Sequence, residues 1–195
     1  MNEPTANQWL LLIYKIPTEP TRFRTYIWRH VKTLGCLNLH KTAWLLPKTP
    51  DLEAETQKLA VKIEEFGGEV SLLTTTSPGA EWEAKVIAGF NAIRDEEYAE
   101  VTENEERFED EIHRETRKQK FTFAELEDME AEWEKINQGM RRAQARDYFG
   151  APGRREAEAR LAEGARLLDT FSKKVYEREG VEGSAGTKED GGQHG

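Results

Sequence analysis

The sequence predicts an α+β fold, in which a small sheet-and-helix module is followed by a region built from helices alone. Short apolar runs and amphipathic stretches alternate up to about residue 76, whereas the pattern after Pro78-Gly79 is helical. Six glycines and almost no apolar side chains mark the end of the chain, and such a composition favours disorder. We therefore expect a module over residues 1–78, a helical region over 79–179 and a disordered tail over 180–195.

Four segments of the module have the composition of β-strands. Residues 9–14 form an apolar run that ends at Ile16-Pro17, which is typical of a buried strand. Two short strands follow at residues 36–40 and 43–46, and a fourth β-rich run covers residues 70–74. The spacing leaves room for one helix after the first strand and another before the fourth.

Two amphipathic helices fill these gaps. Pro20 opens the first, because its fixed φ suits the first turn of a helix, and Gly35 stops it. A second helix runs from about Asp51 to Phe66 and ends at Gly67-Gly68. The resulting order is βαββαβ, which is the ferredoxin-like arrangement. The apolar faces comprise Phe23, Ile27, Val31 and Leu34 in the first helix, and Leu52, Leu59, Ile63 and Phe66 in the second.

The second half of the chain contains three helical stretches. The first runs from Ala80 to about Lys118. Thr122 and Glu125 then have the spacing of a capping box, which opens a helix whose apolar residues recur in steps of three and four. Residues 150–152 form a turn, so this helix and the next are expected to pack as an antiparallel, coiled-coil-like hairpin. The predicted seam comprises Leu126, Met129, Trp133, Ile136, Met140 and Ala143.

Charge is distributed unevenly along the chain, although the net charge is −9. Residues 9–50 carry seven bases and one acid, Glu19, whereas residues 81–147 carry twenty acids and eleven bases. An asymmetry of this size within one chain is informative where the net charge is not. We expect the first module to bind anions, and we interpret the acidic run over residues 95–111 as a solvated helix face.

The basic face of the first predicted helix is the leading candidate for a binding site. A turn of about 100° per residue places Arg22, Arg29 and Lys32 nearly opposite the apolar face. Arg24 extends this positive surface, and Tyr26 and Trp28 interleave with it. The planar guanidinium group of arginine and the rings of aromatic residues are well suited to contact with a phosphate backbone. The alternatives are an ordinary solvated helix face and, for Lys15, a charge that caps the end of the first strand. The candidate nucleic-acid or anion-binding residues are Lys15, Arg22, Arg24, Arg29 and Lys32.

The remaining reactive side chains do not combine into a recognisable catalytic or cofactor site. His113 follows Glu109 and Asp110 at helical spacing, but such pairs arise by chance in an acidic stretch. Cys36 is the only cysteine, which excludes an internal disulfide and favours core packing over a redox role. We therefore expect neither enzymatic activity nor a cofactor or bound metal.

The chain is expected to reside in the cytoplasm. Its longest apolar run near the start, residues 9–14, is far shorter than a membrane span. No basic stretch precedes that run and no small-residue cleavage site follows it, so it lacks the pattern of a signal peptide. We expect no association with a membrane.

The chain also contains a set of short motifs in a fixed order: Trp9–Pro20, Trp28, Leu34-Gly35, Ala43–Pro47, Ile63–Gly68, Arg94–Tyr98, Lys120–Glu125 and Ala145–Pro152. In order and spacing this set resembles the N-terminal region of ChrB proteins, from about residue 9 to 178. The resemblance implies a role in chromate resistance, as a DNA-binding transcriptional regulator of its own operon with chromate as an effector. The alternative is a non-enzymatic adaptor in chromate resistance, whose helical hairpin recruits a partner protein.

The first module further resembles the ferredoxin-like domains of the phenylacetic-acid-pathway repressors and of small CRISPR-associated nucleases. Those nucleases carry a metal-binding Asp at the end of the first strand, where this sequence has Lys15. A cation at that position repels a divalent metal, which argues against nuclease activity. Related ferredoxin-like proteins form dimers, and a four-stranded sheet has free edges, so we expect a homodimer.

Overall fold

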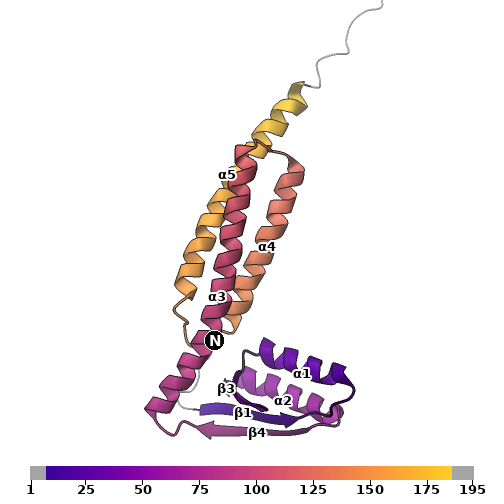
Figure 1. Cartoon of the computed structure of the whole chain (residues 1–195), viewed down its shortest axis with the longest axis vertical. Coiled ribbons are helices and arrows are strands. Elements are labelled where there is room, and N and C mark those ends of the chain that lie inside the picture. Colours follow the sequence, from indigo (N-terminus) through magenta and orange to yellow (C-terminus); the bar gives the residue numbers. More distant parts are fainter. Residues whose placement is uncertain (1–7, 186–195) are drawn as a thin grey trace, which may run out of the picture. The chain divides into compact units, whose positions relative to one another are not determined.

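The computed structural model describes residues 8–185, with side chains up to residue 180, and confirms the predicted α+β class (Figure 1). The chain divides into two compact units. The first unit ends at Arg94 and also contains Ala145–Ala151, whereas the second comprises Asp95–Gln144 and the chain from Pro152 on. The division therefore lies inside a helix, and not at residue 78, where the sequence predicts the end of the first module.

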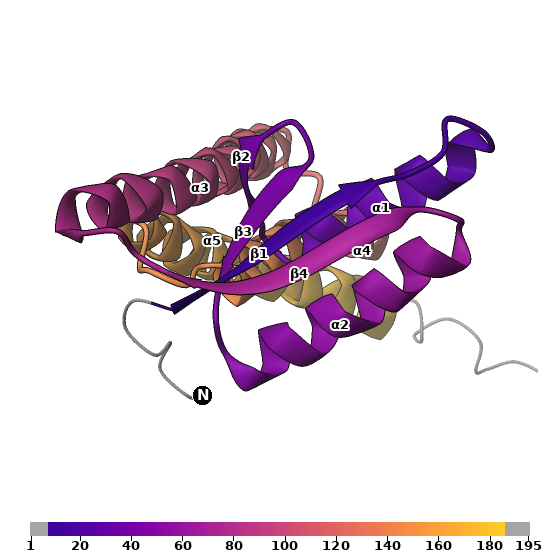
Figure 2. The same ribbon diagram turned by 90° about the horizontal axis from the view of Figure 1, so that it is seen from below.

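The first unit contains a four-stranded antiparallel sheet and two helices, in the chain order β1, α1, β2, β3, α2, β4. The strands lie side by side in the order β2-β3-β1-β4, as Figure 2 shows, which confirms the predicted βαββαβ arrangement. The bounds are Gln8–Lys15 for β1, Thr21–Thr33 for α1, Leu37–His40 for β2, Ala43–Pro47 for β3, Pro50–Glu65 for α2 and Glu69–Thr76 for β4.

The two helices begin and end close to the predicted positions. The Thr49 hydroxyl accepts a hydrogen bond from the Leu52 amide at 3.2 Å and so caps the start of α2. Gly35 and Gly67 follow the two helices with φ values of 67° and 73°. This left-handed conformation costs glycine little, because it has no Cβ, and it turns the chain back toward the next strand.

One face of the sheet packs against both helices. Strand alternation directs Leu10, Leu12, Trp44 and Leu46 toward this side, where they form one buried cluster with helix residues. The helices contribute Ile27, Val31, Leu59 and Ile63, all of which are at most 4% exposed. This core fixes the orientation of α1, so the residues on the opposite side of that helix face solvent.

The other face of the sheet is covered in part by the start of α3, Ala80–Arg117. Trp9 and Leu45 are buried here with Val86 and Phe90 of α3. Phe149, from the segment 145–151 that returns to this unit, lies 5.8 Å from the Trp9 ring and 5.3 Å from the Phe90 ring, measured between centroids. A segment predicted as a helix end and a turn therefore completes the core of the first unit.

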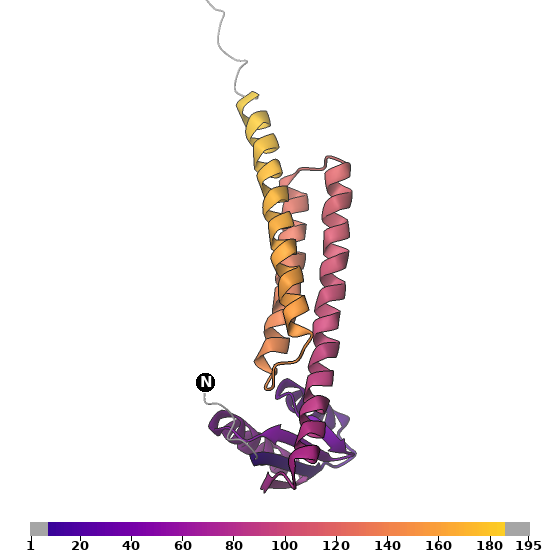
Figure 3. The same cartoon turned by 90° about the vertical axis from the view of Figure 1, so that its left-hand side faces the viewer.

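The second unit consists of the rest of α3 together with α4, Phe123–Ala145, and α5, Arg154–Ala185, which lie side by side (Figures 1 and 3). The predicted seam of α4 is buried at Leu126, Met129, Ile136, Met140 and Ala143. Trp133 is only half-buried, and its ring stacks on Phe108 of α3 at 5.1 Å between centroids. The predicted hairpin is thus part of a three-helix arrangement.

Helix α5 continues to Ala185, beyond residue 179, where the sequence predicts the end of the helical region. Residues 186–195 of the predicted tail lie outside the described residues. Among the helices that are described, none combines the length and the apolar composition needed to cross a membrane.

Candidate nucleic-acid interface

The four predicted bases of α1 are all exposed. Arg22, Arg24, Arg29 and Lys32 are accessible to solvent, whereas Ile27 and Val31 of the same helix are completely buried. The helix contains no acidic residue. The spacing-based prediction of a basic face opposite the apolar face therefore matches the exposure of these residues.

The charges of α1 are not neutralised by neighbouring side chains. Within residues 8–180, Arg24, Arg29 and Lys32 form no side-chain ion pair or hydrogen bond, and the Arg22 guanidinium lies 5.3 Å from the centre of the Phe23 ring. The neighbouring helix α2 is different, because Lys58 is paired with Glu55 at 2.6 Å. Cations without acidic partners are free to meet an external anion.

Aromatic side chains lie beside these bases. Trp28 is 52% exposed and stands one turn from both Arg24 and Lys32, so the three side chains form a stripe along α1. Tyr26 is 39% exposed, and its ring lies 4.0 Å from that of His30. Exposed rings beside arginine and lysine are suited to contact with sugars and bases as well as phosphates.

Lys15 differs from the α1 bases in its surroundings. It is the last residue of β1 and it is exposed, as predicted. Its partner across the β1–β4 ladder is Glu69, however, so an acid stands on the neighbouring strand. This arrangement favours the interpretation of Lys15 as a charge at a strand end over that of a ligand contact.

The C-terminal end of α1 is held by the returning segment 145–151. Tyr148 donates its hydroxyl proton to the Leu34 carbonyl at 2.7 Å, and the Arg146 guanidinium donates to the Lys32 carbonyl at 3.3 Å. Both carbonyls belong to the last turn of the helix, where intrahelical partners run out. The sequence does not predict this contact, although the motif Ala145–Pro152 marks the segment as distinctive.

Neither of the other reactive candidates forms a site in the described part of the chain. Cys36 is 3% exposed, and burial raises the pKa of its thiol to about 12, so the group is a protonated core residue. His113 lies 3.5 Å from Glu109 as a pair on the surface of α3. No three His, Cys, Asp or Glu side chains come together there in a way that could hold a metal ion.

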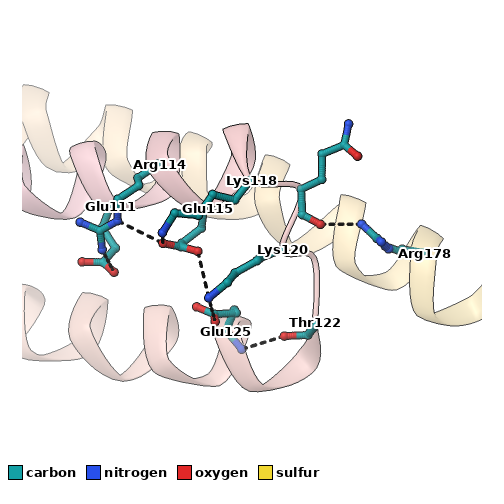
Figure 4. Close-up of polar contacts among 9 residues, drawn as sticks. Glu111, Arg114, Glu115, Lys118, Lys120, Thr122, Glu125 and Arg178 are labelled. Atoms are coloured by element: carbon teal, nitrogen blue, oxygen red, sulfur yellow. Dashed lines mark hydrogen bonds and ion pairs between the residues drawn. The ribbon is translucent and has the colours of Figure 1, made fainter.

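A polar cluster fastens the turn between α3 and α4 (Figure 4). The buried Glu115 carboxylate accepts from Lys118 at 2.8 Å and from Arg114 at 3.1 Å, and these hydrogen bonds lower its pKa to about 2. Lys120 lies 3.6 Å from the same carboxylate and donates to Glu125 at 3.2 Å. These contacts bridge the two helices, and they give the cluster a structural role.

The predicted capping box at the start of α4 is formed only in part. The Thr122 hydroxyl accepts from the Glu125 amide at 3.3 Å, which is one half of that arrangement. The Glu125 carboxylate pairs with Lys120, however, and does not return to the Thr122 amide. The lysine competes successfully for the carboxylate because it offers a full charge.

One acid of the run 95–111 contradicts the expectation of a uniformly solvated face. Glu105 is 0% exposed, and within the described residues neither carboxylate oxygen has a hydrogen-bond partner. Burial, reinforced by the nearby Glu109, raises the pKa of Glu105, whereas Arg160 acts in the opposite direction. Glu105 can be buried here because Gly164 of α5 has no side chain. A Cβ added to Gly164 would lie 2.9 Å from a Glu105 carboxylate oxygen.

Two comparisons relate the sequence of this chain to known proteins. The family model described as "Protein ChrB, N-terminal" matches residues 24–182. A curated relative, "Protein ChrB" from Cupriavidus metallidurans, is 38% identical over 92 residues, which cover 47% of this chain and 28% of the relative. The matched part thus spans less than a third of that relative's length.

Proposed function

Because the chain belongs to the ChrB family, we propose that it acts in chromate resistance as a DNA-binding transcriptional regulator, with α1 as the surface that meets DNA. The proposal includes the promoter of its own operon as the target and chromate as the effector. It assigns the chain no enzymatic activity and no cofactor, and it places the protein in the cytoplasm.

The observation that carries the proposal is the set of exposed cations on α1 that have no acidic partner. Phosphate contacts supply most of the non-specific affinity of DNA-binding proteins, through the release of condensed counterions. Arg22, Arg29 and Lys32 lie on the side of α1 that is turned away from the core, so a duplex can approach them without disturbing the fold. Trp28 lies beside them for contact with sugar or base.

The test is a binding titration with a labelled duplex from the operon's own promoter, compared with a duplex of scrambled sequence. We expect Arg22→Ala, Arg29→Ala and Lys32→Ala together to weaken binding to both duplexes, because phosphate contacts carry no base information. Each lost contact should reduce the slope of log affinity against log salt by about one unit. The circular dichroism spectrum should not change.

A matched control removes the same charge elsewhere in the first unit. Lys41, Lys58 and Lys85 are exposed and lie outside α1, so their triple replacement by Ala should leave most of the affinity intact. If both triple variants lose affinity equally, α1 is not the binding surface. If the parent protein binds no DNA even at low salt, the regulator proposal fails.

An adaptor that recruits a partner protein through its helices is the second candidate function. The observation that favours it is a groove between α3 and α4 in the second unit, whose lining carries four acids and one base. A surface of this sign repels DNA, so it would serve a different partner from the one proposed for α1.

A further inference from the structure

The groove between α3 and α4 has a volume of about 430 Å³. Its lining residues come from two consecutive helices of the second unit, and they combine an apolar base with a charged border. The lining comprises Asn104, Arg107, Phe108 and Glu111 of α3, and Glu125, Asp128, Met129 and Glu132 of α4.

The base of the groove is formed by Phe108 and Met129, which are 2% and 3% exposed. A methionine beside an aromatic ring gives an adaptable apolar surface, because the unbranched thioether has several low-energy rotamers. Both side chains are recessed, so only an apolar group that enters the groove would contact them.

The border carries four acids and one base, Arg107, whose guanidinium donates to the Asn104 side chain and to the Glu103 carbonyl. Two of the acids already have basic neighbours. Glu111 pairs with Arg114 and Glu125 with Lys120, as Figure 4 shows. Asp128 and Glu132, by contrast, have no ion-pair or hydrogen-bond partner within the part of the chain that the structure describes. They stand four residues apart on one edge of the groove, where like charges on a helix destabilise each other.

We propose that this groove binds a cationic amphipathic helix of a partner protein. Lysine or arginine side chains spaced three or four residues apart on the partner would pair with Asp128 and Glu132, and an apolar side chain between them would contact Phe108 and Met129. This mode of recognition places the apolar face of a helix in a groove, and its anchors recur at helical spacing.

Charge complementarity selects this occupant over others. The acids of the border repel a nucleic acid, and no group of three ligating side chains is present among the described residues to favour a metal ion. A cationic helix, in contrast, relieves the repulsion between Asp128 and Glu132 and can direct one apolar side chain to the recessed Phe108 and Met129. The inference does not depend on DNA binding by α1.

The same helix provides a matched control. Glu127 and Glu130 of α4 are exposed, but they do not line the groove. A helical turn of about 100° per residue directs them to the other side of Met129 from Asp128 and Glu132. Changing either pair to lysine alters the net charge of the protein equally, so only the position of the charge differs.

The experiment measures the binding of a fluorescein-labelled synthetic peptide to the full chain by anisotropy. The peptide is an amphipathic helix of about 18 residues with lysines on one face, a tryptophan between them and leucines beside it. We expect the double variant D128K/E132K to bind about tenfold more weakly than the parent, a loss of ~1.4 kcal/mol, while E127K/E130K keeps nearly the parent affinity. A peptide with glutamate in place of lysine should not bind.

Three results would overturn the proposal. Equal losses in the two variants would show that only the net charge matters, and an unchanged affinity in D128K/E132K would show that the groove is not the site. A change in the oligomeric state of the peptide-free protein caused by D128K/E132K would show that the groove is an interface between copies of this chain. The milder pair D128N/E132Q, checked by circular dichroism, separates a loss of contact from a loss of folding.

Discussion

We predict that Glu105→Gln stabilises the protein at neutral pH and leaves its stability unchanged at acidic pH. The side chain is fully buried, and within the described residues neither carboxylate oxygen accepts a hydrogen bond. Its pKa is raised above the ordinary value of 4.5 by burial and by Glu109. The folded protein therefore retains a proton that the unfolded chain releases.

The sign of the effect follows from this difference in proton binding. Between pH 4.5 and the raised pKa of Glu105, the folded state binds more protons than the unfolded state, so the free energy of unfolding falls as pH rises. A glutamine cannot ionise and lacks this dependence. The difference between variant and parent should be absent below pH 4.5, grow through this window and then level off.

The size of the gain depends on what replaces the carboxylate. An unsatisfied buried polar group costs about 1–3 kcal/mol, and a charged group costs more. Attraction to Arg160 offsets part of this cost for Glu105. Glutamine keeps an unsatisfied amide, so Glu105→Met should give the larger gain, of about 1–3 kcal/mol at neutral pH. A gain of 1 kcal/mol corresponds to roughly 2–4 °C in Tm for a chain of this size.

Urea unfolding followed by circular dichroism, in steps from about pH 4 to about pH 8, provides the measurement. Glu100→Gln is the control, because Glu100 lies on the same helix and is exposed. If Glu105→Gln instead destabilises the protein at neutral pH, Glu105 is an ionised partner of Arg160, and the reasoning from burial is wrong.

Two further predictions concern packing and assembly. In thermal melts, Gly164→Ala should destabilise the protein by about 1–3 kcal/mol, because the new Cβ would lie 2.6 Å from a Trp133 ring carbon. The control Gly139→Ala makes only an ordinary contact at 3.4 Å, so it should be neutral or stabilising. Homodimerisation is expected through the β4 edge, because β4 spans eight residues and pairs with a neighbour on one side only. Light scattering of a strict monomer at tens of micromolar would contradict this expectation.

Local patterns in the sequence were sufficient to predict the sheet module. Strand alternation and the two glycines that end α1 and α2 depend on nearby residues only, so they are visible in the sequence. The division of the chain was not visible, because the same helical period continues through α3. Val86 of α3 packs against the sheet and Val101 packs against α4. Both contacts need the same spacing of about one apolar residue per helical turn, so the sequence pattern does not change at the division. The role of Tyr148 was also hidden, because its partner Leu34 lies 114 residues away.

The exposed positions of the candidate site were predictable from the sequence. Helical geometry alone directs Arg29 away from Val31 and the core. Lys58 and Arg29 already differ in the sequence, because Glu55 precedes Lys58 at helical spacing whereas α1 contains no acid. Burial of Glu105, by contrast, required a glycine on another helix, which no local pattern reveals.

The return of residues 145–151 to the first unit determines how that unit can be isolated. A fragment that ends at Arg94 would lose Phe149 from the cluster around Trp9 and Phe90, and it would leave the Leu34 carbonyl without the Tyr148 hydroxyl. Such a truncation would expose aromatic surface and invite aggregation. A self-sufficient minimal domain therefore has to be spliced, with a short linker in place of residues 95–144. In topological terms, α4 and part of α3 are an insertion into the sheet domain, and only α5 is an appendage at its end.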